Sequence, residues 1–253
     1  MSPPGNADRL AAQPIAAGGT ATRTWIRWGR RFPELDLKGC RSVLVVAPHP
    51  DDETFGFGAT AATLHSRGIG VQVVSASDGG AAHPGLSPDE RVALERRRRA
   101  ELRCATSILD LPQPICLGLP DGELAAHSPQ LTAILTGLLA ARGPGAWCAA
   151  TWRGDGHPDH EAVGRAAAAA AAHTGAVLLE YPVWMWHWAT PDDDAVPWQR
   201  AARITPDPAA AGRKRAAAKV YSSQLDAPQP GSEPVLPPPV AHRLLTVDEL
   251  VFR

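Results

Sequence analysis

Short apolar runs alternate with longer segments of mixed polarity over most of the chain. Five runs have the length and the small or β-branched composition of buried strands; they cover residues 43–47, 71–76, 114–117, 146–151 and 176–181. Segments of helical length follow four of them, at residues 54–66, 88–109, 130–141 and 163–173. Strands separated by helices of this length indicate βαβ units. The predicted fold class is therefore α/β, with a mainly parallel sheet flanked by helices.

The N-terminal part lacks this alternation. Residues 1–20 are rich in Pro, Gly, Ala and Ser, a composition typical of segments without fixed structure. Residues 24–32 are expected to form a short amphipathic helix that packs on the domain. We therefore divide the chain into an N-terminal extension, residues 1–36, and one domain, residues 37–253.

The C-terminal part is also less regular. A helix is expected over residues 208–221, followed by a proline-rich stretch over 228–239. Such a stretch favours an extended conformation along the surface. Residues 247–252 are expected to form a final edge strand.

Composition excludes several classes of function. The chain of 253 residues has a formal net charge of −1, which predicts no binding to nucleic acid or to an anionic membrane surface. No apolar run approaches the ~20 residues of a membrane span, and the N-terminus lacks the layout of a signal peptide. A cytoplasmic location is therefore expected. The four cysteines form no CxxC pair, so neither a disulfide framework nor a thiolate metal site is predicted.

Polar clusters follow two of the predicted strands. The segment HPDDE, residues 49–53, comes after the strand at 43–47, and the segment HPDH, residues 157–160, comes after the strand at 146–151. Parallel strands end at the same edge of a sheet, where open α/β sheets bind ligands. Other polar or aromatic residues that follow strands are Asp78, Asp121 and the tryptophans of 184–188. The sequence therefore predicts one site at that edge.

The two clusters contain a candidate set of metal ligands. His49, Asp52 and His160 offer two nitrogens and one oxygen, which leaves a coordination position open for water on Zn²⁺. The same set also suits Fe²⁺. Bound zinc lowers the pKa of its water to about 7, which provides a nucleophile near neutral pH.

Three further residues are candidates for proton transfer, for stabilisation of negative charge and for orienting an imidazole. Asp51 lies next to a ligand without coordinating itself, so it is expected to accept the proton of the water. His157 is expected to stabilise an oxyanion or protonate a leaving group, and Asp159 to orient an imidazole. A structural role is the alternative, because an aspartate after a strand often caps the following helix.

These motifs resemble the two signature motifs of the PIG-L/LmbE family of metal-dependent N-acetylglucosaminyl deacetylases. The resemblance covers roughly residues 40–225 and includes Asp78-Gly79, Pro120-Asp121-Gly122 and Ser223-Gln224. It implies a Rossmann-like fold and the zinc-dependent removal of an acetyl group from an N-acetylglucosamine-type sugar in a glycoside or glycoconjugate. The expected partner is this small-molecule substrate, and the oligomeric state stays open.

The resemblance also implies roles for individual residues. His49, Asp52 and His160 match the zinc ligands, Asp51 the general base and His157 the oxyanion-stabilising histidine. Substrate-contacting positions of the family correspond to Arg98 and Asp121. Some relatives have a tyrosine two residues before the first histidine of the second motif, where this chain has Asp155.

The tryptophan cluster allows two interpretations. Trp184, Trp186 and Trp188 alternate, so they share one face if the segment is extended. They form either a hydrophobic cover over the sheet edge or a wall on which a sugar ring or an apolar aglycone stacks. The substrate-binding hypothesis names Trp184 and Trp186.

Two other functions fit the same donor set. A metal-dependent hydrolase could act on another acyl bond or on a phosphoester. A non-catalytic sugar-binding protein could keep a structural metal, although such a site does not need the uncoordinated carboxylate of Asp51.

Overall fold

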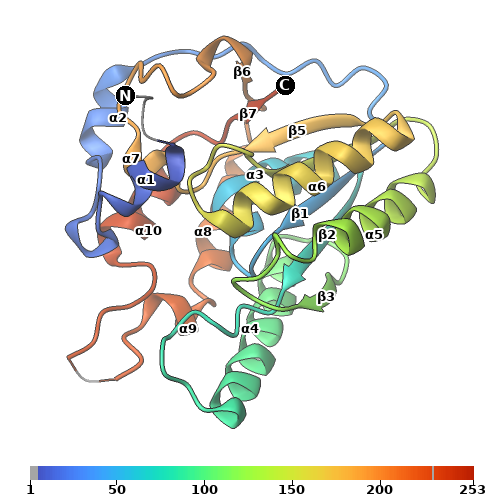
Figure 1. Cartoon of the computed structure of the whole chain (residues 1–253). Helices are drawn as coiled ribbons and strands as arrows, with labels where there is room; N and C mark the ends of the chain where they lie inside the picture. The colour runs from blue at the N-terminus through green and yellow to red at the C-terminus, as the bar shows by residue number, and fades with distance from the viewer. Residues whose placement is uncertain (1–4, 230) are drawn as a thin grey trace.

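A seven-stranded sheet of order β3-β2-β1-β4-β5-β7-β6 runs through the computed structural model, which describes residues 5–229 and 231–253 (Figure 1). The five expected strands are present as β1 Ser42–Ala47, β2 Gly70–Ser77, β3 Ile115–Leu119, β4 Ala146–Thr151 and β5 Val177–Tyr181. They pair in parallel. The predicted α/β class with a mainly parallel sheet is confirmed.

The chain changes direction across the sheet at β1. It builds β2 and β3 on one side of β1 and then crosses over to place β4 and β5 on the other side. The carboxyl ends of β1 and β4 are therefore neighbours at a topological switch point, which is where α/β sheets bind ligands. Each of these two ends carries one of the polar clusters.

Helices cover both faces of the sheet. These helices are α3 Asp52–Ser66, α4 Pro88–Ile108, α5 Ser128–Ala140, α6 Pro158–Thr174 and α8 Pro208–Ala218. Figure 1 shows α5 and α6 on one face of the sheet. Successive side chains of a strand point to opposite faces, so Val43 and Val45 pack with residues of α3, α4 and α8, whereas Leu44 and Val46 pack with residues of α5 and α6. The sheet thus separates two hydrophobic cores.

Two helix starts show how local sequence sets the boundaries. Ser87 and Glu90 form a capping box before α4, in which the Ser87 backbone N–H donates to Glu90 Oε2 at 2.8 Å. Helix α6 begins at Pro158, earlier than the expected residue 163. Proline suits the first helical turn because its missing N–H needs no partner there.

The C-terminal strand differs from the expected edge strand. Strand β7, Val251–Phe252, pairs antiparallel with β5 on one side and with β6, Ala201–Ala202, on the other. It therefore fills the free edge of β5, and β6 forms the edge of the sheet. Helix α10, Pro238–Thr246, begins inside the stretch expected to be extended, of which residue 230 lies outside the described residues.

The N-terminal segment also differs from the expectation. Residues 5–20 contain helix α1, Asn6–Ala11, and the 3₁₀ turn η1, Ile15–Ala17, instead of lacking structure; residues 1–4 lie outside the described part. Asn6 Nδ2 donates to the Gly154 carbonyl at 2.7 Å, and Arg9 pairs with Asp193 at 2.9 Å. The expected helix near residue 24 is present as α2, Thr22–Trp28. A few anchoring contacts thus order a segment whose composition alone suggests disorder.

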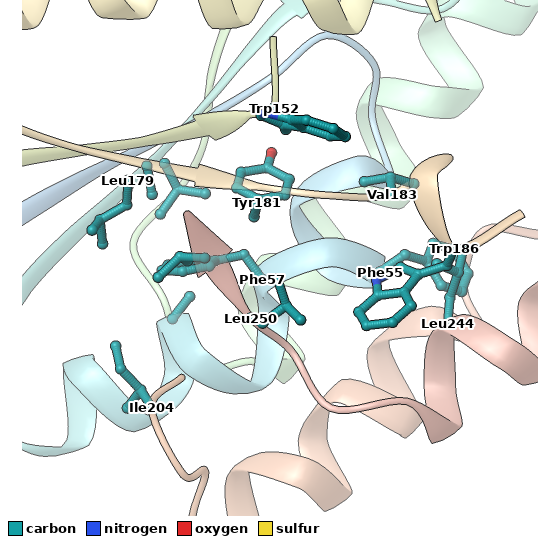
Figure 2. Close-up of a cluster of buried hydrophobic side chains, with 14 of the residues drawn as sticks. Phe55, Phe57, Trp152, Leu179, Tyr181, Val183, Trp186, Ile204, Leu244 and Leu250 are labelled. Atoms are coloured by element: carbon teal, nitrogen blue, oxygen red, sulfur yellow. The ribbon is translucent and has the colours of Figure 1, made fainter. Parts of the chain in front are cut away.

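The tryptophan cluster is helical rather than extended. Met185–Trp188 form the short helix α7, so the tryptophans do not share one face. Trp186 is buried and packs edge-on against Trp25, with ring centroids 4.9 Å apart. Figure 2 shows Trp186 in the buried cluster that also contains Phe55 and Leu244. For Trp186 the hydrophobic-cover interpretation fits.

Two negative findings concern the described residues. None of their helices combines the length and the apolar character needed to cross a bilayer. The four cysteines are all unpaired, and while Cys148 is buried, Cys104 is exposed.

Candidate active site

The first polar cluster occupies the turn between β1 and α3. Asp51 immediately precedes α3 and has φ 138° and ψ −34°, a conformation that is strained for any residue other than glycine. Its backbone N–H donates to Glu53 Oε2 at 3.1 Å, and the other Glu53 oxygen accepts from the Tyr221 hydroxyl at 2.6 Å. Backbone strain of this kind is typical of functional sites, and here a buried network maintains it.

The second polar cluster occupies the turn between β4 and α6. His157 caps α6: its Nδ1 accepts from the Asp159 backbone N–H at 3.2 Å. His160 lies in the first turn of the helix and is fully buried. Because β1 and β4 are adjacent parallel strands, the two turns face each other.

The three predicted metal ligands converge. His49 Nδ1 lies 3.1 Å from Asp52 Oδ2, and His160 Nε2 lies 3.4 Å from Asp52 Oδ1. One ligand atom of each residue lies within 4.8 Å of the other two. Among the described residues, neither ring nitrogen of the buried His160 makes a hydrogen bond, although Nδ1 lies close to Asp155. A buried polar atom without a partner is costly, so Nε2, which lies close to Asp52, fits the coordination of a metal. Two imidazoles and one carboxylate are ligands that suit zinc or ferrous iron.

Two further carboxylates, those of Asp121 and Asp159, lie close to Nε2 of His49. His49 Nε2 lies 2.9 Å from Asp121 Oδ1 and 3.3 Å from Asp159 Oδ2. Asp159 also accepts the backbone N–H groups of Gly122 and Leu124. Burial alone would lower the pKa of His49, but the facing carboxylates raise it well above its usual value. Asp159 and Asp121 thus both lie within contact distance of His49 Nε2, and the orienting role expected for Asp159 stays a prediction.

Asp51 is held by an arginine. Arg98 is 3% exposed, and its Nη2 donates to Asp51 Oδ2 at 3.3 Å and to the Pro50 carbonyl at 2.9 Å. Its Nη1 donates to the Gly79 carbonyl at 3.0 Å. Burial raises the pKa of Asp51 well above its usual value, although the charge of Arg98 opposes this effect. Arg98, expected to contact substrate, is engaged in fixing the Asp51 carboxylate.

His157 is a neutral imidazole that can act as a hydrogen-bond donor. Burial and the neighbouring imidazoles of His160 and His49 lower its pKa to about 3, so the ring is neutral at pH 7. Since Nδ1 accepts from the Asp159 backbone, the single ring hydrogen belongs on Nε2. A neutral imidazole of this tautomer can donate to an oxyanion.

Asp155 has a role that sequence reasoning did not assign. This carboxylate is fully buried, and its Oδ2 lies 2.8 Å from His160 Nδ1. It also accepts, at 2.9 Å each, the backbone N–H groups of Val183, Trp184 and Met185. Asp155 therefore connects a candidate metal ligand to the start of α7. The sequence feature that could have indicated this role is the position of Asp155, two residues before the histidine motif, where some relatives have tyrosine.

A cavity of about 260 Å³ opens over these residues. Its polar lining residues, which we call the polar side, are His49, Asp51, Asp52, Arg98, Asp121, His157 and Gln224. Its apolar lining includes Phe55, Val183 and a group that we call the apolar wall, namely Ile15, Trp184, Val235, Leu236 and Leu244. Trp186 is not part of this wall, because it lines a separate cavity with Trp25 and Trp28. Of the two tryptophans expected to contact substrate, the structure brings only Trp184 to the site.

Comparison with known proteins gives matches to deacetylases. Residues 44–171 match the model of the family described as PIG-L, GlcNAc-PI de-N-acetylase. A curated relative from Bacillus anthracis, the probable N-acetyl-alpha-D-glucosaminyl L-malate deacetylase 2, is 30% identical over 139 residues. That alignment covers 54% of this chain and 62% of the relative, so the chain spans less than two thirds of the length of the relative.

Solved structures share the fold. The conserved protein TT1542 from Thermus thermophilus has a TM-score of 0.59 and 28% identity, with 83% of this chain and 93% of that chain covered. The N,N'-diacetylchitobiose deacetylase from Pyrococcus horikoshii has a TM-score of 0.56 and 24% identity, with 75% and 72% covered. The A40926 pseudoaglycone deacetylase Dbv21 has a TM-score of 0.58 and 24% identity, with 76% and 87% covered. At the identity of the last two, the likeness concerns the fold alone.

Proposed function

Since this chain belongs to the PIG-L, GlcNAc-PI de-N-acetylase, family, we propose that it removes the N-acetyl group from an N-acetylglucosamine-type amino sugar in a glycoside or glycoconjugate. The observation that carries the proposal is the convergence of His49, Asp52 and His160 beside a cavity that Asp51 also lines. The name of the Bacillus anthracis relative, an N-acetylglucosaminyl deacetylase, supports the substrate class.

The proposed ligands are His49, Asp52 and His160, and the proposed metal is zinc, with ferrous iron as the other metal that fits. When bound, such a metal supplies a water whose pKa is lowered to about 7 and a positive charge for the amide oxygen. His160 Nδ1 faces Asp155, which leaves Nε2 directed at the centre. The chain thereby presents two imidazole nitrogens and one carboxylate oxygen to the same point.

Asp51 is the proposed general base. It lines the cavity beside the ligands, and Arg98 fixes its carboxylate. A fixed carboxylate at this position can accept the proton of the attacking water and then pass it to the departing amine. The strained backbone of Asp51 is consistent with a side chain that is positioned for this task.

His157 is the proposed oxyanion donor. Attack of water on the amide carbon places negative charge on the former carbonyl oxygen. The Nε2–H of His157 can donate to this oxygen, and donors prearranged in this way contribute strongly to catalysis. The cap interaction with Asp159 keeps the ring in the required tautomer.

A screen of glycosides tests the function. Protein supplied with Zn²⁺ or Fe²⁺ is incubated with N-acetylglucosaminides that differ in aglycone, and mass spectrometry follows the loss of one acetyl group. Release of acetate at a metal-dependent rate is expected. Release of phosphate from phosphoesters without any release of acetate would instead support the phosphoesterase alternative. The cytoplasmic location expected from the sequence stays a prediction.

A further inference from the structure

We propose that the apolar wall is a subsite for a neutral, apolar aglycone of the amino-sugar substrate. This inference rests on the proposed function and makes it more specific, because it states the chemical character of the aglycone attached to the amino sugar. The wall consists of Ile15, Trp184, Val235, Leu236 and Leu244, which line the same cavity as His49, Asp51 and His157.

The apolar wall lies outside the part of the chain that matches the family model. The match covers residues 44–171, whereas the wall comes from η1, from the residue before α7, and from residues 235–244. The residues proposed for catalysis all lie within the match. The wall therefore comes from segments that the family model does not cover, which is where we expect specificity to be determined.

The wall is fixed in place by hydrogen bonds of its backbone. The Leu236 N–H donates to the Gln224 carbonyl at 2.9 Å, and Gln224 itself lines the cavity. The Trp184 N–H donates to the buried carboxylate of Asp155 at 2.9 Å. A surface held in this way is already formed before a ligand binds, which lowers the entropy lost on binding.

Charge in the cavity argues against an anionic aglycone. Arg98 is the one lysine or arginine that lines the cavity in the described part of the chain. Its guanidinium already donates to Asp51, to the Pro50 carbonyl and to the Gly79 carbonyl. A carboxylate or phosphate on the aglycone would therefore find no free cationic side chain, while the apolar wall offers it no hydrogen bond.

The solvent exposure of the lining residues indicates that the aglycone, rather than the acyl chain, contacts the apolar wall. Asp51 and Asp52, which line the cavity, are 6% and 5% exposed, so the amide reacts deep in the cavity. Ile15 and Val235 are only half-buried, so this part of the wall lies near the opening. The aglycone is the part of the substrate that is far from the amide, whereas an acyl chain begins at the reacting carbon.

Two substrate series test the subsite. In the first series the acetamide is constant and the aglycone is methyl, propyl or pentyl; in the second the aglycone is methyl and the acyl group is acetyl, butanoyl or hexanoyl. Burial of a methylene contributes ~0.8 kcal/mol, or about fourfold. We therefore expect kcat/KM to rise about tenfold or more from methyl to pentyl. A 4-carboxybutyl aglycone should lose most of this gain.

A pair of matched variants locates the effect. Val235→Ser removes apolar surface from the wall, and Val92→Ser makes the same change at an exposed position of α4, outside the cavity. The dependence on aglycone length should become flatter in Val235→Ser and stay as in the wild type in Val92→Ser. Equal values for methyl and pentyl in the wild type, or the same slope in both variants, would overturn the proposal. A rise confined to the acyl series would overturn the assignment to the aglycone.

A binding measurement separates this proposal from the proposed function. Calorimetry of methyl and pentyl glucosaminides, which carry a free amine, requires no turnover. If no glycoside is deacetylated, the proposed function fails, yet tighter binding of the pentyl compound that is lost in Val235→Ser would still support the apolar subsite. Equal affinities for the two compounds would overturn it.

Discussion

The two sides of the cavity are built in different ways. Most of the polar side comes from two turns, after β1 and β4, whose strands are adjacent and parallel. The apolar wall comes from segments far apart in the chain, such as Ile15 and Leu244. Sheet topology therefore positions the catalytic side chains. The peripheral segments determine which group attached to the sugar the cavity accepts.

The two sides also differ in the forces that maintain them. On the polar side, buried carboxylates lie close to the imidazoles, as Asp155 Oδ2 lies 2.8 Å from His160 Nδ1. The wall is maintained by apolar packing in addition to its backbone hydrogen bonds, since Leu236 and Leu244 belong to the hydrophobic core. Substitutions should therefore affect turnover and metal binding on one side, and stability and substrate preference on the other.

The largest effect is expected for Asp51→Asn. Removal of the proposed general base should lower kcat about 10²–10⁴-fold, while metal content stays close to that of the wild type. Asp89→Asn, at an exposed position of α4, is the matched control with the same change of charge. Steady-state deacetylation assays on both variants give the answer, and turnover close to that of the wild type in Asp51→Asn would exclude this residue as the base.

Trp186→Ala and Trp184→Ala should separate packing from substrate binding. Trp186 packs against Trp25 away from the catalytic cavity, so its removal should lower the free energy of unfolding by about 3–5 kcal/mol. Trp184 lines the cavity, so its removal should raise KM for apolar aglycones more than the Trp186 substitution does. Denaturant unfolding and kinetics on both variants provide the comparison. A greater effect of Trp186→Ala on KM would contradict the assignment.

Asp155→Asn tests the connection between the two sides. Loss of a carboxylate behind a metal-ligating histidine typically lowers metal affinity about 10–100-fold. Because Asp155 also accepts the backbone N–H groups before α7, the variant should in addition alter the preference for aglycone length. Metal titration against a competing chelator measures the first effect. Unchanged metal affinity would show that His160 does not depend on Asp155 for its orientation.

The smallest effect is expected for Arg9→Ala. The ion pair of Arg9 with Asp193 is partly exposed, and such pairs contribute about 0.2–1 kcal/mol. The N-terminal segment should therefore stay docked, because Leu10 and Ile15 pack against the core. Thermal unfolding of this variant beside Arg165→Ala, which removes an exposed pair on α6, tests this. A clear loss of the aglycone preference in Arg9→Ala would mean that the ion pair, rather than apolar packing, holds Ile15 in the wall.

The sequence predicted the polar side far better than the wall. The strands before His49 and His157 are continuous apolar runs, and parallel pairing then brings their ends together whatever the details of the loops. The roles of Arg98 and Asp121 could not be predicted in the same way. Each side chain contacts a catalytic residue that is distant in the sequence, and only packing decides whether a polar group faces a neighbour or a substrate.

The terminal segments show the same limit. Residues 5–20 have the composition of a disordered segment, yet a few anchors such as Asn6 order them against the domain. Strand β7 depends on the free edge of β5, which no local pattern reveals. Trp184 and Trp186 are two residues apart and lie in different cavities because the segment is helical.

Metal content tests the central claim most directly. Elemental analysis of the wild type, Asp51→Asn and His160→Ala, each purified without added metal and checked for folding by circular dichroism, should find one divalent ion per chain in the first two proteins and a large loss in the third. His160 supplies a ligand in this account, whereas Asp51 only handles the proton. A wild type that holds no metal even after incubation with Zn²⁺ or Fe²⁺, or equal metal content in all three proteins, would contradict the account.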